Sequence, residues 1–316
     1  MTPGTEEGER MRVTIATAPC CWGVDDVSNP DLPPWERVLD EAAAAGYGGI
    51  ELGPYGYMPL DLATVSEALE RRGLHIVAGT IFDDLVSPAN RDRLLRQTEE
   101  ICALVSRLPQ SEPLPRQRHP TLYLTVMDWG HDERDYAAGH SDRAPRLSDE
   151  AWAGMVANIR AVAERAREHG VRAVIHPHAG GHVEFEDEIA RVLADVPADL
   201  AGLCLDTGHA WYAGMDPVET LEAHADRLDY VHFKDIDRTV FDRVMAERIR
   251  FFEACARGVM CPIGRGVIDY PAVRETLERI GYGGFITVEQ ERDPRDAGGS
   301  LADVKASRDY LASVGF

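Results

Sequence analysis

The sequence lacks the features of a membrane-spanning, disulfide-bonded or nucleic-acid-binding protein. Its apolar runs fall short of the about 18 residues that a membrane span requires. Its six cysteines show no C-x-x-C spacing, and the adjacent pair Cys20–Cys21 is poorly suited to bond to itself, so we expect a reduced, cytoplasmic protein. Only 33 basic residues stand against 54 acidic ones, and the net charge of −21 repels phosphate backbones and anionic lipid. We therefore expect neither nucleic acid nor a membrane as a partner.

What is present fits one large domain. Hydrophobic residues make up 44% of the 316 positions, which is enough for a sizeable core. Residues 1–11 (MTPGTEEGERM) are polar and carry no signal-peptide segment, so they are predicted to form a flexible N-terminal tail. No linker or shift in composition divides residues 12–316, which are predicted to form a single domain.

Short apolar runs rich in β-branched residues alternate with longer segments of helical periodicity. Two predicted helices, 35–46 and 152–170, end in a glycine suited to a helix C-terminus. The predicted strands are 12–17, 48–52, 75–80, 121–127, 172–176, 202–206, 229–233 and 284–289. Eight strands, each followed by a helix, predict a (β/α)8 TIM barrel. The alternative, an open doubly wound sheet, usually has a G-x-G-x-x-G loop after a strand, and no such loop follows a predicted strand here.

Four consecutive strands in the second half of the chain each end on a side chain that can bind a metal ion. These side chains are His176, Asp206, His232 and Glu289. Because the C-terminal strand ends of a TIM barrel meet around one axis, the two imidazoles and two carboxylates are predicted to converge. Taken alone, each has a structural explanation, since Asp206, for instance, could cap the next turn. Taken together, two carboxylates buried without a cation would be costly, and a shared divalent ion removes that cost.

A cluster of histidines accompanies the first of these strand ends. Only 11 histidines occur in the chain, yet three fall within seven positions, at 176, 178 and 182. Because strand side chains alternate, His178 points the same way as His176 and can reach a substrate above the metal. His182 lies beyond the AGG turn and is assigned to the loop.

Further polar residues follow the next strands. His209, three residues after Asp206, lies at a turn where its ring can face a bound ligand, and Lys234 shares its side of the strand with His232. Glu291 belongs to an acidic run and is expected to be solvated. The long segment 235–268 is predicted to form an active-site lid.

Several segments carry the motifs of a known family. The most specific are DTGH (206–209), HFKD (232–235) and VEQERDP (288–294). Others, in the same order along nearly the whole chain, are APCCWGVDD, AGYGGIELGPYGYMP, HPHAGGHVEFEDEIARVL and PIGRGVIDY. With these motifs the chain resembles the xylose isomerase-like barrel superfamily of sugar isomerases and epimerases, and most closely its inosose dehydratase type. It departs at WGVDD (22–26), where an Asn is expected before the Asp pair, and at QERDP (290–294), which replaces an AEQDP-like run.

The resemblance implies a metal-dependent enzyme that removes water from a keto-polyol such as inosose through an enolate. It implies one divalent ion, Mn²⁺ or Co²⁺ ahead of Mg²⁺ or Zn²⁺, and a barrel that often pairs as a homo-oligomer. The implied metal ligands are His176, Asp206, His232 and Glu289. The candidates for proton transfer and polarisation are His178, His209, Lys234 and Glu51. The candidates for substrate contact are Trp22, Asp25, Asp26 and Arg265.

Other functions stay open at this point. A ketose isomerase or epimerase, or a lyase acting on 3-keto sugars or C-glycosides, would use the same metal and the same first proton transfer. The superfamily also contains endonucleases that cut at abasic sites, but the charge of −21 disfavours that branch. A non-catalytic, metal-dependent binding subunit would hold the metal and show no turnover.

Overall fold

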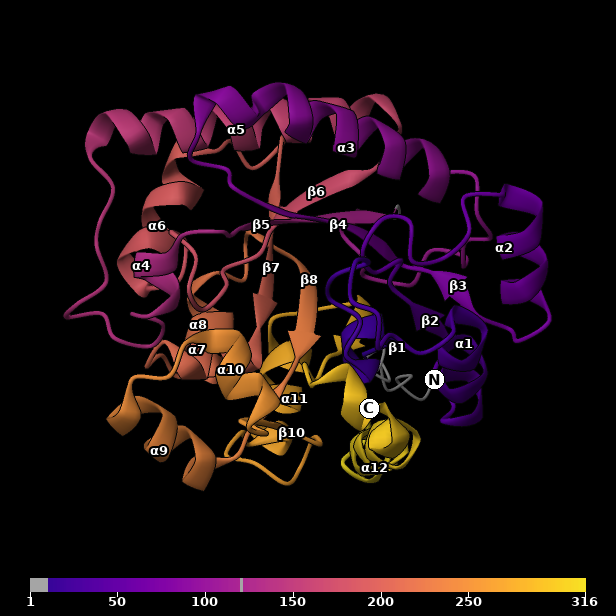
Figure 1. The fold of residues 1–316 in the computed structure, drawn as a ribbon. Coiled ribbons are helices and arrows are strands. Elements are labelled where there is room, and N and C mark those ends of the chain that lie inside the picture. The colour runs from indigo at the N-terminus through magenta and orange to yellow at the C-terminus, as the bar shows by residue number, and fades with distance from the viewer. Residues whose placement is uncertain (1–10, 120–121) are drawn as a thin grey trace, which may run out of the picture.

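The computed structural model describes residues 11–119 and 122–316, and its centre is a parallel sheet rolled into a barrel (Figure 1). The strands of this sheet are β1 (Val13–Thr17), β2 (Gly49–Ile50), β3 (His75–Ile76), β4 (Ala78–Asp83), β5 (Tyr123–Asp128), β6 (Arg172–Ile175), β7 (Gly202–Asp206), β8 (Leu228–Phe233) and β11 (Gly284–Val288). They are ordered β3-β2-β1-β11-β8-β7-β6-β5-β4. Only Val77 separates β3 from β4, so the two ends of the sheet belong to one interrupted strand and the barrel is nearly closed. The predicted TIM barrel is confirmed.

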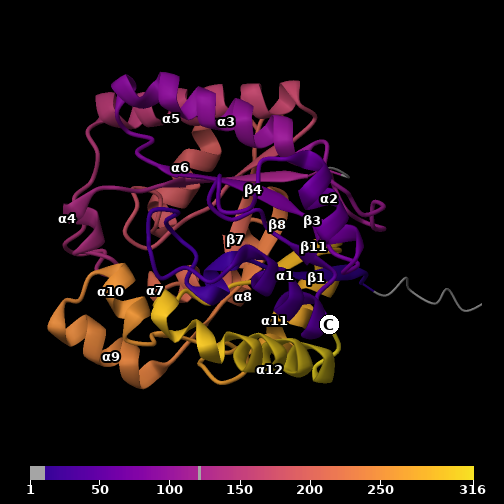
Figure 2. The same cartoon turned by 45° about the vertical axis from the view of Figure 1, so that its right-hand side comes forward.

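Helices cover the outside of the barrel (Figures 1 and 2). They are α1 (Trp35–Ala44), α2 (Leu62–Glu70), α3 (Arg91–Val105), α5 (Asp149–Glu168), α6 (Glu186–Asp195), α8 (Pro217–Ala223), α11 (Tyr270–Arg279) and α12 (Ser300–Ser313). Shorter turns of helix follow some strand ends, namely η1 (Pro19–Trp22), η2 (Pro88–Asn90), α4 (Asp132–Asp135), α7 (Thr207–Tyr212) and η3 (Pro294–Gly299). The helices α3 and α5 lie side by side in both views.

Helix ends follow local signals in the sequence. The Ser148 side chain accepts a hydrogen bond from the backbone N–H of Ala151 and so caps the start of α5. At the other end of α5, Gly170 adopts φ 72°, and Gly46 adopts φ 86° after α1. These left-handed conformations favour glycine, so the two predicted glycine stops are confirmed.

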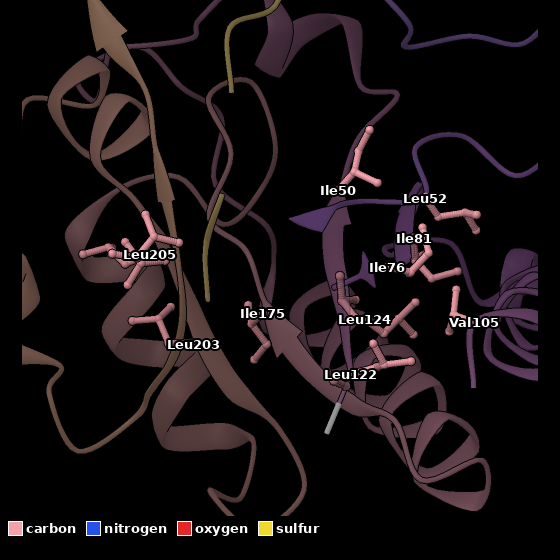
Figure 3. Close-up of a cluster of buried hydrophobic side chains, with 14 of the residues drawn as sticks. Ile50, Leu52, Ile76, Ile81, Val105, Leu122, Leu124, Ile175, Leu203 and Leu205 are labelled. Atoms are coloured by element: carbon pink, nitrogen blue, oxygen red, sulfur yellow. The ribbon is translucent and has the colours of Figure 1, made fainter. Parts of the chain in front are cut away.

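Alternation along the strands sends one set of side chains outward and another into the barrel. The outward set packs against the helices, and Figure 3 shows Ile50, Leu52, Ile76, Ile81, Leu122, Leu124, Ile175, Leu203 and Leu205 of the same hydrophobic cluster as Val105 of α3. The inward set includes Val174, Cys204, Tyr230 and Phe285. Because the period is two, inward positions recur at His176, Asp206, His232 and Glu289. The register of the core therefore places polar side chains at the barrel mouth.

The segment 235–268 forms a small unit at that mouth. It contains the antiparallel pair β9 (Asp235–Ile236) and β10 (Met260–Cys261), with α9 (Arg238–Glu247) and α10 (Phe251–Ala256) between them. The Asp235 carboxylate accepts hydrogen bonds from the backbone N–H groups of Gly264, Gly266 and Ile268. These bonds tie the end of the segment back to its beginning.

Two expectations fall partly outside the described residues. Of the predicted tail 1–11 only Met11 is described, and Thr121, at the start of a predicted strand, is not. Across residues 11–119 and 122–316, the helices are all too short or too polar to cross a membrane.

Candidate metal centre

The structure brings the four predicted metal ligands together at the barrel mouth. One ligand atom each from His176, Asp206, His232 and Glu289 lies within 4.8 Å of all the others. His232 Nδ1 is 3.1 Å from His176 Nε2 and 3.0 Å from Glu289 Oε2. Asp206 Oδ2 lies 3.9 Å from His176 Nε2. Two imidazoles and two carboxylates thus face one common centre.

The chemistry of these groups fits a divalent cation. Asp206 Oδ1 accepts a hydrogen bond from the His209 backbone N–H, whereas Oδ2 is buried and makes no hydrogen bond to any described residue. Burial, reinforced by His232, holds the pKa of His176 well below its usual value, so the ring is neutral and offers a lone pair. Burial alone would raise the pKa of Glu289, but the neighbouring His232 outweighs it and keeps the pKa well below its usual value. Burial acts to lower the pKa of His232, but the neighbouring Cys204, Glu289 and Glu51 raise it well above its usual value, so a metal ion would have to displace a proton from this ring. Deprotonated imidazoles and carboxylates are the ligands that Mn²⁺, Co²⁺ and Zn²⁺ accept.

Lys234 lies fully buried beside this centre and is one of only two lysines in the chain. Its Nζ is 3.4 Å from Asp206 Oδ2 and 3.2 Å from Glu289 Oε2, and it makes a still shorter contact with Glu291. Burial acts to lower the pKa of Lys234, but Asp206, Glu291 and Glu289 raise it well above its usual value. Lys234 is therefore the protein's own counter-ion for three buried carboxylates.

Two further predicted residues, His178 and His209, pack against each other beside Lys234, with ring centroids 4.0 Å apart and planes inclined by 42°. His178 Nδ1 lies 2.9 Å from the Ala179 carbonyl oxygen, and the Ala179 N–H donates to His209 Nδ1. Burial, followed by the charge of Lys234, lowers the pKa of His178 to about 3, so this ring is neutral. His209 Nε2 lies 3.0 Å from Lys234 Nζ. The two rings link the lysine to the loop after β6.

A cavity of ≈ 610 Å³ opens at the barrel mouth. Its polar wall is formed by Cys20, Glu51, His178, Glu289 and Glu291. Its apolar wall includes Val24, Ile81, Phe82, Met127 and Phe252. The aromatic part continues to Trp129, whose ring is 5.1 Å from that of Phe82 and 5.0 Å from that of Phe252. A small polar molecule can therefore meet titratable groups on one side and an aromatic surface on the other.

Two predicted substrate contacts, Asp25 and Asp26, line this cavity and an adjoining one of ≈ 560 Å³. Burial, followed by the charge of Glu291, raises the pKa of Asp25 well above its usual value. Asp26 is exposed, and its carboxylate accepts a hydrogen bond from the Ser28 backbone N–H. Both residues therefore lie where the two cavities adjoin.

The other two predicted substrate contacts, Trp22 and Arg265, line neither of these cavities. Trp22 is buried, and its indole N–H donates to Glu41 of α1, because η1 turns the ring back toward the helix layer. The Arg265 side chain is 65% exposed and 3.9 Å from Asp303 of α12. The glycines on either side of Arg265 bond to Asp235, which holds this turn at the surface.

Glu51 and Glu291 reach the site in unexpected ways. Glu51, a predicted proton-transfer residue, lines the cavity and also lies 2.9 Å from His232 Nε2. The expectation that Glu291 is solvated is wrong, because this residue is only 5% exposed and contacts Lys234. Its position two residues after Glu289 keeps it on the same face, and this period of two could have revealed it in the sequence.

The predicted lid supplies part of the cavity wall. Phe252 of α10 lines both cavities, and the ring of Phe251 is 5.0 Å from that of His178 and 5.2 Å from that of His209. Sequence reasoning located the segment but missed both aromatic residues, because an FF pair within a helix is equally typical of a core.

Comparisons with known proteins agree with this architecture. Residues 39–314 match the family model described as a xylose isomerase-like TIM barrel. The rhizopine catabolism protein MocC of Rhizobium meliloti is 31% identical over 290 residues, which cover 91% of this chain and 84% of that protein. An inosose dehydratase of Geobacillus kaustophilus (strain HTA426) is 32% identical over 292 residues, 89% of this chain and 88% of that protein. A solved structure of the IOLI protein with a bound zinc atom has the same fold, with a TM-score of 0.69 and 14% identity over 96% of this chain and 98% of that one. The chain belongs to the xylose isomerase-like TIM barrel family.

Proposed function

We propose that the protein is a divalent-metal-dependent dehydratase that removes water from a keto-polyol such as inosose. The observation that carries this proposal is the convergence of His176, Asp206, His232 and Glu289 within 4.8 Å. Asp206 Oδ2 is buried there and makes no hydrogen bond to the described residues. The similarity to an inosose dehydratase supports the substrate class, and the zinc atom bound by the similarly folded IOLI protein supports a metal-binding role for the barrel. We favour Mn²⁺ or Co²⁺ over Mg²⁺ or Zn²⁺.

A divalent ion at this centre would supply a Lewis acid for the ketone oxygen of the substrate. The chain's own residues would then move the protons. We assign His178 as the proton acceptor, because its Nδ1 faces the Ala179 carbonyl and donates to it, which leaves the lone pair on Nε2. The ring lines the cavity, where Nε2 can take the proton from the carbon next to the ketone.

The departing hydroxyl needs a proton to leave as water. We assign this donation to Lys234 acting through Glu291, since Lys234 contacts Glu291 and Glu291 lines the cavity. His209 Nε2, 3.0 Å from Lys234 Nζ, holds the lysine in place. Asp25 and Asp26, which line the cavity, would accept hydrogen bonds from polyol hydroxyls.

The aromatic wall would shield the reacting carbons from water. Phe82 and Phe252 offer apolar faces that match the C–H face of a polyol ring, while its hydroxyls point to the polar wall. Exclusion of solvent strengthens the electrostatic contacts at the metal centre.

Proton NMR in deuterated water tests the reaction. The metal-loaded protein is incubated with inosose, and the expected result is loss of water with formation of a UV-absorbing dione. Deuterium exchange without loss of water would replace the dehydratase with an isomerase or epimerase. Stoichiometric metal with neither exchange nor turnover on inosose or any other keto-polyol would contradict an enzymatic role.

A further inference from the structure

His232 presents its two ring nitrogens to two different neighbourhoods. Nδ1 faces the metal centre, at 3.1 Å from His176 Nε2 and 3.0 Å from Glu289 Oε2. Nε2 points away from that centre, is buried, and makes no hydrogen bond of good geometry to the described residues. Glu51 Oε1 lies 2.9 Å from this Nε2. The carboxylate therefore stands on the opposite side of the ring from the metal centre.

Glu51 is itself held in place by a second residue of the same strand as His232. The Tyr230 hydroxyl donates to Glu51 Oε1 over 2.7 Å and also makes a very short contact with Thr287 Oγ1. The Tyr230 ring stacks on Tyr123, with centroids 4.8 Å apart and planes inclined by 17°. Glu51, which follows β2, thus reaches across the barrel to β8 and is fixed there by a buried tyrosine.

The Cys204 thiol is the alternative partner for the His232 ring. Cys204 also belongs to a group with His176 and His232 whose polar atoms lie within 4.8 Å of one another. A thiol sulfur is only a weak hydrogen-bond acceptor. A carboxylate at 2.9 Å is the stronger partner for an N–H group.

We propose that Glu51 is a positioning residue that acts on the metal centre through His232, rather than a proton-transfer residue that acts on substrate. With its carboxylate 2.9 Å from Nε2, Glu51 favours the His232 tautomer that carries its proton on Nε2 and leaves Nδ1 free to bind the ion. Metal-binding histidines commonly use a carboxylate in this way, and loss of that carboxylate lowers metal affinity. This inference rests on the proposed metal centre and is independent of which keto-polyol the protein converts.

Metal affinity of Glu51→Gln tests the assignment. The dissociation constant of Mn²⁺ or Zn²⁺ is measured by competition with a fluorescent chelator, and the expected change is a rise of about 10- to 100-fold. The visible spectrum of the Co²⁺-loaded variant should also change, because it reports on how the ligands are oriented. Glu51→Asp keeps the charge and should retain more affinity than the Gln variant, and Tyr230→Phe should lose less than Glu51→Gln. Cys204→Ala is the matched control and should bind metal as the wild type does.

The outcomes separate the two roles of Glu51. Wild-type metal affinity and Co²⁺ spectrum in a folded Glu51→Gln variant that has lost turnover would overturn the proposal and make Glu51 a catalytic residue. An equal loss of affinity in Cys204→Ala would transfer the role to the thiol. Absence of divalent-metal binding by the wild type would instead contradict the metal centre itself, and so the proposed function.

Discussion

Replacing Lys234 with methionine tests how the buried carboxylates are stabilised in the metal-free protein. The change keeps the length of the apolar stem and removes the ammonium group that lies between Asp206, Glu289 and Glu291. All three carboxylates are part of the buried centre, so the variant leaves them close together without the one ammonium group that pairs with all three. We expect the metal-free variant to be much less stable than the metal-free wild type.

The expected size of this effect follows from the burial of the ion pairs. Lys234 is 0% exposed, and breaking a buried pair by removing one partner costs about 3–5 kcal/mol. For a chain longer than 250 residues this corresponds to a fall in melting temperature of roughly 6–10 °C, at about 2 °C per kcal/mol. Added metal should recover part of the loss, because the ion takes over the oxygens of Asp206 and Glu289.

Thermal unfolding measured in EDTA and again in excess Mn²⁺ provides the assay. The increase in melting temperature on adding metal should be larger for Lys234→Met than for the wild type. Lys305→Met is the matched control, since this lysine is on the surface of α12 and pairs with Asp309, an interaction worth about 0.3–0.5 kcal/mol. Turnover should fall in Lys234→Met and stay unchanged in the control. Equal melting temperatures of the two metal-free variants would refute the counter-ion role of Lys234.

Three further predictions concern the candidate metal centre, the predicted lid and the hydrogen bond between His131 and Asp128. Asp206→Ala and Glu289→Ala should each lose bound metal and most activity while the barrel stays folded, and full metal occupancy by elemental analysis in both would disprove the ligand set. Phe252→Ala removes an aromatic face of the cavity and should raise KM about 2- to 10-fold at unchanged metal content, since such contacts contribute about 0.5–1.5 kcal/mol; an unaltered KM would argue against contact with substrate. Burial acts to lower the pKa of His131, but the hydrogen bond to Asp128 outweighs it and raises the pKa above its value in the unfolded chain. The stabilisation that this hydrogen bond gives the folded protein is therefore complete below the unfolded pKa and is lost as pH rises through the folded pKa. His131→Gln should therefore lose about 1 kcal/mol of unfolding free energy at pH 5.5 and little at pH 9, and a pH-independent loss in chemical denaturation would show that the charge is not involved.

Much of the barrel could be predicted from local patterns. Short apolar runs in the sequence indicate the strands. Glycines indicate where helices stop, because glycine favours the left-handed conformation found at Gly46 and Gly170. These are properties of a few neighbouring residues and need no knowledge of distant contacts. The missed features, the split of one strand at Val77 and the short ribbon β9–β10, depend on how the sheet closes and on how the lid folds back.

The convergence of the four predicted metal ligands could also be predicted from the sequence. A period of two along a strand determines which residues face the barrel, and a parallel barrel brings the ends of all its strands to one rim. Once His176 and Asp206 were assigned to consecutive strand ends, their convergence followed from the fold class. The same rule places Glu291 on the inward face. It was instead expected to be solvated, because it belongs to an acidic run.

Tertiary structure alone decided which side chains touch. The contact of Glu51 with His232 joins strands that are not neighbours in the sheet, and no local pattern predicts a contact across the barrel. Trp22 belongs to the same first loop as Asp25, yet one turn of chain sends its indole to α1 and leaves the carboxylate in the cavity. Periodicity determines the face on which a side chain stands, because it is a property of the backbone. The partner that a side chain meets depends on the packing of distant segments, and only the folded chain brings those segments together.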